Sequence, residues 1–141
     1  MTRKEFFARV GFGAAAVLVP VCITGIATSC SSDNSIGGNP PPTGVDFLVD
    51  VSTGSLATNG GFMVTKEIVI ARTLTGDFLA VSASCTHAAT NVNYSASGNK
   101  FVCPTHGSEF SSTGVVTSGP ATRNLTVYNT TLNGNSLRVF S

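Results

Sequence analysis

Two short segments, Cys85-Thr86-His87 and Cys103-Pro104-Thr105-His106, constrain the fold of this chain more than any other part of its sequence. They contain both histidines and two of the four cysteines. Cysteine thiolates and histidine imidazoles are common transition-metal ligands, and within each segment they lie at the spacing of a turn. Fifteen residues separate His87 from Cys103. The fold must therefore bring two loops together, so that two thiolates and two imidazoles converge on one site.

The chain after residue 44 consists of short apolar segments separated by turn residues. The Gly, Asn and Asp residues of the separators tolerate the positive φ angles of tight hairpin turns. No stretch of 12 or more residues in this part shows helical spacing, so we predict an all-β domain, a small antiparallel sandwich or partly open barrel. The predicted strands lie within residues 46–51, 61–72, 77–84, 100–103, 114–117, 125–129 and 137–140.

Residues 1–30 have the composition of an export signal. Basic residues near the start are followed by residues 10–29, which carry no charge, and this order is typical of a signal peptide. Small residues precede Cys30, as in a bacterial lipoprotein signal that is cleaved before the cysteine and acylated on it. An uncleaved helix is an alternative, because roughly 20 apolar residues span a bilayer, and a cleaved soluble form is another. We predict an exported protein, anchored to the membrane and facing the periplasm.

Residues 31–44 are rich in Ser, Gly and Pro and offer little that a core could bury, so we predict a tether. Residues 45–141 are then sufficient for one domain. Eight basic and seven acidic side chains give a net charge of +1, which provides no long-range field for attracting nucleic acid or acidic substrates. We therefore predict no nucleic-acid partner.

At the two Cys-His segments the sequence resembles the Rieske iron-sulfur family, and the match continues through Gly107-Ser108. The resemblance implies a 2Fe-2S cluster in which Cys85 and Cys103 hold one iron, and His87 and His106 hold the other. Because two neutral imidazoles replace two charged thiolates, such a centre is less negative than an all-cysteine cluster and repels an added electron less. Rieske centres have potentials of about −150 to +300 mV, against about −400 mV for plant-type ferredoxins.

The resemblance also implies roles for residues around the cluster. Ser108 matches a serine whose hydroxyl bonds a bridging sulfide, whereas Phe110 stands where quinol-oxidising members have a tyrosine that bonds a cysteine sulfur. Pro120 matches a proline in a loop that shields the cluster, and its ring would stiffen that loop. Thr90 and Thr105 stand where those members have a disulfide between the two loops. With one of the two hydrogen bonds and no disulfide, we expect a potential in the middle of the range.

A structural zinc ion and a plain disulfide are the alternatives to a cluster. Two cysteines and two histidines also suit tetrahedral zinc, although zinc sites more often place cysteine near cysteine and histidine near histidine in the sequence. A disulfide between Cys85 and Cys103 suits an exported protein, but it gives no role to the histidines. Ser108 and Pro120 can equally be ordinary turn residues, and Phe110 an ordinary core residue.

The resemblance implies one-electron transfer with other redox proteins. We predict the iron-sulfur subunit of a membrane quinol-oxidising cytochrome complex, in which His87 or His106 meets the quinol. The alternative is the small electron-transfer subunit of a periplasmic oxidoreductase of the arsenite-oxidase kind. Since both histidines are assigned to iron, neither remains as the base that a serine nucleophile needs. We predict no catalysis by the isolated chain.

Overall fold

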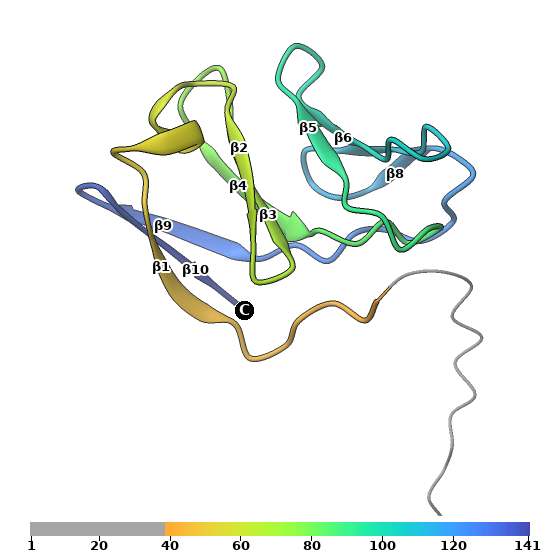
Figure 1. Cartoon of the computed structure of the whole chain (residues 1–141), viewed down its shortest axis with the longest axis horizontal. Coiled ribbons are helices and arrows are strands. Elements are labelled where there is room, and N and C mark those ends of the chain that lie inside the picture. The colour runs from red at the N-terminus through yellow and green to blue at the C-terminus, as the bar shows by residue number, and fades with distance from the viewer. Residues whose placement is uncertain (1–38) are drawn as a thin grey trace, which may run out of the picture. The chain divides into compact units, whose positions relative to one another are not determined.

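A computed structural model describes residues 39–141, which form an almost entirely β unit (Figure 1). Every strand pairing in this range is antiparallel, as predicted. The predicted export signal, Cys30 and the tether up to residue 38 lie outside the described residues. The elements are β1 (Asp46–Asp50), the 3-10 helix η1 (Gly54–Ala57), β2 (Phe62–Thr65), β3 (Ile68–Arg72), β4 (Phe78–Ser82), β5 (Asn93–Ser95), β6 (Lys100–Val102), β7 (Glu109–Ser111), β8 (Val116–Ser118), β9 (Asn129–Asn133) and β10 (Ser136–Phe140).

The strands form three sheets, with the orders β1-β10-β9, β2-β3-β4 and β5-β6-β7-β8. Strand β3 is buried on both faces, and successive side chains of a strand point to opposite faces. Ile68 and Ile70 therefore join the core shared with β10, while Val69 and Ala71 join the core that contains Phe101 of the four-stranded sheet. The β2-β3-β4 sheet thus connects the two cores, and the four-stranded sheet positions the two Cys-His segments at its strand ends.

The prediction of one strand at 61–72 was wrong, because this range forms two strands, β2 and β3, joined by a tight turn. Lys66 and Glu67 form this turn and have φ angles of 49° and 61°. Hairpin turns with two positive φ angles favour Asn-Gly or Asp-Gly, so the Lys-Glu pair gave no turn signal. Left-handed backbone is uncommon for residues other than glycine, and its occurrence at two adjacent side-chain-bearing residues indicates that the surrounding structure holds the turn.

Three further strands differ from the prediction. Residues 125–128 are not a regular strand, since only Val127 forms an isolated bridge, with Val81, and β9 begins at Asn129. Strands β5 and β7 are three residues long and largely polar, so neither shows the apolar alternation that reveals a half-buried strand.

The last part of the predicted tether is held against the domain. The backbone N–H of Asn39 donates to Ser84 Oγ over 3.1 Å, and the Tyr128 hydroxyl donates to the Pro42 carbonyl over 2.8 Å. The sequence predicted a tether here, because residues 31–44 offer little that a core could bury and the three successive prolines favour an extended polyproline geometry. Among residues 39–141, no helix has both the length and the apolar character needed to cross a membrane.

Candidate metal centre

The first Cys-His segment lies in a loop that leaves β4 and enters β5. The loop is closed at its base by a bridge between Ser84 and Asn91 and by the Val92 N–H, which donates to the Ala83 carbonyl over 2.8 Å. Inside the loop, the Cys85 N–H donates to the Thr90 carbonyl over 2.9 Å. These bonds fix the backbone on both sides of the Cys85 side chain.

The second Cys-His segment forms a tight loop between β6 and β7. The Cys103 N–H donates to the Ser108 carbonyl over 2.8 Å, and the Gly107 N–H donates to the Cys103 carbonyl over 3.0 Å. Gly107 has a φ of 74°, which a residue with a side chain rarely adopts. The turn therefore requires glycine after His106, and this explains the Gly in the motif.

The structure places the four predicted ligands as two pairs, with cysteine beside cysteine and histidine beside histidine. Cys85 and Cys103 are fully buried, form no disulfide, and lie close enough for each thiol to influence the pKa of the other. The rings of His87 and His106 meet edge to face, with their centroids 4.9 Å apart. Within residues 39–141, no three His, Cys, Asp or Glu side chains gather closely around one point.

Nearby backbone N–H groups lower the pKa of both cysteine thiols. Burial raises the pKa of the Cys85 thiol, the N–H groups of His87 and Ala88 offset part of this rise, and neighbouring Cys103 adds to it. Burial also raises the pKa of Cys103, but its hydrogen bonds to Cys85 and to the N–H groups of Thr105 and His106 outweigh it, so its pKa is lowered. Donors already aimed at sulfur stabilise negative charge on a bound cluster.

The two histidines differ in exposure. His106 is exposed, whereas His87 is half-buried, and its Nδ1 is buried with no hydrogen-bond partner among the described residues. A buried polar atom without a partner costs free energy, and a metal ion would satisfy a ring nitrogen in such a position. Of the two histidines, the exposed His106 is the one that another molecule can reach more easily.

A third segment, between β8 and β9, is bound to both loops. The Ala121 N–H donates to the Oγ of the fully buried Ser108 over 3.0 Å. The Thr86 hydroxyl donates to the Arg123 carbonyl over 2.7 Å. Pro120 is exposed in this segment, and its neighbour Ala121 carries the contact. The family motif pointed to Pro120 and not to Thr86, although the position of Thr86 between Cys85 and His87 was an available signal.

Thr90 and Thr105, predicted to replace a disulfide, join the two loops. The Thr105 hydroxyl donates to Thr90 Oγ1 over 2.8 Å. Phe110 is fully buried in the core opposite Phe101 on β6, which is the role of a core residue, and its ring offers no hydrogen-bond donor to a sulfur. The Thr105–Thr90 hydrogen bond thus stands where a disulfide was expected. The apolar ring of Phe110 stands where a tyrosine hydroxyl was expected.

The comparisons with known proteins agree with this geometry. The family model of the Rieske [2Fe-2S] domain matches residues 46–129, which is more than half of the chain. The chain belongs to the Rieske [2Fe-2S] family. The cofactor of a Rieske domain is a 2Fe-2S cluster, and the described residues fit it, since they provide two adjacent thiols, two adjacent imidazoles and an unpartnered ring nitrogen.

The chain is also similar in sequence to individual iron-sulfur subunits of cytochrome b6-f complexes. The cytochrome b6-f complex iron-sulfur subunit of Synechococcus sp. strain RCC307 is 30% identical over 135 residues, which cover 86% of this chain and 74% of that subunit. The corresponding subunit of Synechococcus elongatus is 41% identical over 61 residues. Those residues cover 43% of this chain and 34% of the Synechococcus elongatus subunit. The match therefore spans about a third of the length of the first curated relatives.

Two solved structures have a similar fold. The plasma membrane Rieske protein of the cyanobacterium Synechocystis PCC 6803 is 34% identical and superposes with a TM-score of 0.55, over 67% of this chain and 99% of that one. The ferredoxin of carbazole 1,9a-dioxygenase from Nocardioides aromaticivorans is 20% identical, with a TM-score of 0.56 over 70% of this chain and 98% of that one. At this low identity, the similarity to the ferredoxin shows a common fold and nothing about function.

Substituting Ser108 with alanine is expected to destabilise this Rieske domain by about 1–3 kcal/mol, because the N–H of Ala121 would lose its buried acceptor. Chemical denaturation measures the change. Ser97→Ala is the control, because that serine is exposed and its hydroxyl has a hydrogen bond only with Ser95 among the described residues. Equal unfolding free energies for the two variants would contradict a structural role for the Ser108 hydroxyl.

Proposed function

We propose that this chain carries single electrons through a 2Fe-2S cluster, with Cys85 and Cys103 on one iron and His87 and His106 on the other. The observation that supports this assignment is the arrangement of the side chains, thiol beside thiol and imidazole beside imidazole. One iron with two cysteine ligands and one iron with two histidine ligands require this pairing. In the sequence, by contrast, cysteine and histidine alternate. When bound, the cluster supplies a site that accepts and returns one electron.

The protein around the site has four tasks. The buried Cys85 and Cys103 keep water from the sulfur side, and the backbone N–H groups stabilise the added negative charge. The exposed His106 gives a partner short access to the other side. The free ring nitrogen of each histidine can carry a proton, so proton transfer can accompany electron transfer.

The proposed partner is a membrane quinol-oxidising cytochrome complex, of which this chain would be the iron-sulfur subunit. The named relatives, which are cytochrome b6-f iron-sulfur subunits, support this proposal. The electron-transfer subunit of a periplasmic oxidoreductase is the other candidate, supported by the hydrogen bond between Thr90 and Thr105 in place of the disulfide expected in quinol-oxidising members.

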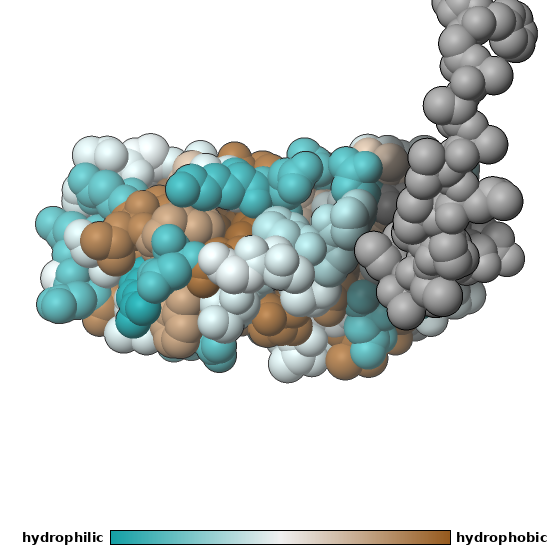
Figure 2. All heavy atoms as spheres, turned by 90° about the horizontal axis from the view of Figure 1, so that it is seen from below, coloured by the Kyte–Doolittle hydropathy of each residue, from teal (hydrophilic) through white to brown (hydrophobic). Residues whose placement is uncertain are grey.

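The surface charge supports a tethered carrier. Residues 39–141 contain five basic and five acidic side chains, and hydrophobic residues lie in several separate places between hydrophilic ones on the face in Figure 2. A domain without net charge has little long-range attraction for a partner, whereas attachment to the same membrane raises the effective concentration of the two proteins. We therefore include in the proposal export and a membrane anchor through the N-terminal segment, with Cys30 as the lipidated residue.

Metal and sulfide analysis of the purified protein tests the cluster. We expect two irons and two inorganic sulfides per chain, a brown colour, and a reduced-state paramagnetic signal whose average g lies below that of all-cysteine clusters. A structural zinc site would instead give a colourless protein with one zinc and no sulfide. Iron bound without sulfide would also contradict the proposal.

A further inference from the structure

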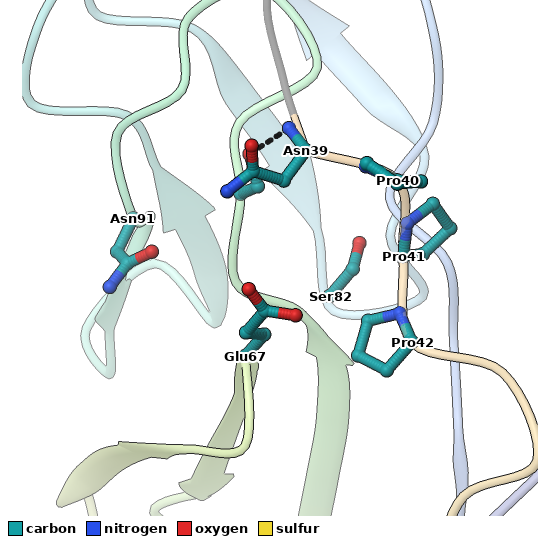
Figure 3. Close-up of a pocket in the computed structure, with 8 residues that line it drawn as sticks. Asn39, Pro40, Pro41, Pro42, Glu67, Ser82 and Asn91 are labelled. Atoms are coloured by element: carbon teal, nitrogen blue, oxygen red, sulfur yellow. Dashed lines mark hydrogen bonds between the residues drawn. The ribbon is translucent and has the colours of Figure 1, made fainter.

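The described part of the predicted tether begins with a segment that lines a pocket on the domain. Asn39–Pro42 runs along one side of this pocket, with Asn91 across from it and the Glu67 carboxylate and Ser82 hydroxyl between them (Figure 3). We call residues 39–42 the proline strap. Its three prolines have fixed φ angles and few conformations to lose, so its docking costs less entropy than docking of a flexible linker.

The proline strap is attached at both ends. Near its start, the Asn39 N–H donates to Ser84 Oγ over 3.1 Å, as the dashed line in Figure 3 shows. At its end, the hydroxyl of the buried Tyr128 donates to the Pro42 carbonyl over 2.8 Å. Burial and the nearby Glu67 carboxylate raise the pKa of the Tyr128 phenol, so the hydroxyl keeps its proton and remains a donor.

The walls of the pocket are the base of the first ligand loop and the strained turn between β2 and β3. Ser84 directly precedes Cys85 and pairs with Asn91, which closes the loop. The turn is also bound to the base of this loop, because the Glu67 carbonyl accepts a hydrogen bond from the N–H of Ala83, the residue before Ser84, over 2.8 Å. Glu67 has a φ of 61°, and this left-handed backbone requires support from its surroundings. The proline strap, the turn and the loop base therefore form one connected unit.

We propose that the proline strap is a positioning element for the first ligand loop, acting through Ser84 to hold Cys85 and His87 in place for the cluster. The effect on the cluster rests on the proposed function, whereas the effect on the loop does not. Without the strap, the Ser84–Asn91 base opens more often, and the N–H groups of the loop bond the Cys85 sulfur less well. The reduced cluster is then less stabilised, so the midpoint potential falls.

Hydrogen exchange and redox titration of the holoprotein test this proposal. Tyr128→Phe removes the bond to Pro42 and keeps the ring in the core, and Tyr128→Phe with Ser84→Ala removes both attachments. The net contribution of one hydrogen bond corresponds to about a fivefold change in opening. We expect the Cys85 and Val92 amides to exchange about fivefold faster in the single variant and roughly 25-fold faster in the double variant, and both midpoints to fall.

Tyr94→Phe is the matched control. Tyr94 is also buried, and its hydroxyl donates to Asn99 Oδ1 over 2.7 Å in the turn between β5 and β6, away from the proline strap. We expect this variant to match the parent in the exchange of Cys85 and Val92 and in midpoint.

Two results would overturn the proposal: unchanged exchange of the Cys85 and Val92 amides in the double variant, or faster exchange with an unchanged midpoint. Sulfide content is measured on the same samples. If sulfide is absent from the parent, the proposed function fails, while the exchange rates still decide whether the strap holds the loop.

Discussion

Replacing Cys103 with serine is expected to yield a protein without iron, inorganic sulfide or brown colour. Cys103 is fully buried beside Cys85, so no other residue or water can readily take its place at the iron. A serine hydroxyl is harder and far less acidic than a thiol, and iron-sulfur clusters are held by thiolates. Absorption spectra and iron and sulfide analysis of the purified variant measure the loss.

Cys30→Ser provides the matched control for this prediction, because it makes the same exchange at the residue predicted to carry a lipid. We expect this variant to keep its full iron and sulfide content and to lose membrane attachment. A Cys103→Ser protein that retains two sulfides per chain would remove Cys103 from the ligand set. Far-ultraviolet circular dichroism of both variants verifies that the β structure is intact.

The fold class could be predicted because the turn residues and the strand periodicity agree over most of the chain. Gly134 has a φ of 60° in the turn between β9 and β10, as its Asn-Gly-Asn context indicates. The turn at Lys66-Glu67 could not be predicted, because its conformation depends on tertiary contacts such as the bond from the Ala83 N–H to the Glu67 carbonyl. Local sequence preference is a weak guide where tertiary packing overrides it.

The candidate centre could be predicted because four soft ligands at two turns are rarely accidental in a chain with two histidines. The contacts that support it join residues far apart in sequence, such as Thr86 with Arg123 and Tyr128 with Pro42. The second partner in each case is a backbone carbonyl, which every residue possesses. A sequence therefore gives no signal for these contacts, and only the structure reveals that the tether reaches the first ligand loop.

Changing His106 to cysteine is expected to lower the midpoint potential by about 125–350 mV, because one neutral ligand becomes a thiolate with a full negative charge. This shift is about half of the difference between the potentials of Rieske centres, about −150 to +300 mV, and the roughly −400 mV of plant-type ferredoxins. Half is taken because one of the two histidines is exchanged. His106 is exposed and its neighbour His87 stays in place, so the exchange adds charge with little disturbance of the core. Redox titration followed by optical or paramagnetic signals measures the shift, and the response of the midpoint to pH should weaken, since one imidazole remains to carry a proton.

Thr122→Cys is the control for this charge effect, because it adds the same thiol to an exposed position of the segment that Arg123 and Ala121 tie to the two ligand loops. A thiol that does not bind iron stays protonated near neutral pH, so the midpoint should equal that of the parent. If His106→Cys retains the cluster with an unaltered midpoint and an unaltered pH response, then His106 is not an iron ligand and uneven ligation does not set the potential. If Thr122→Cys shifts the potential as far as His106→Cys does, a nearby thiol is sufficient and the ligand exchange is not the cause.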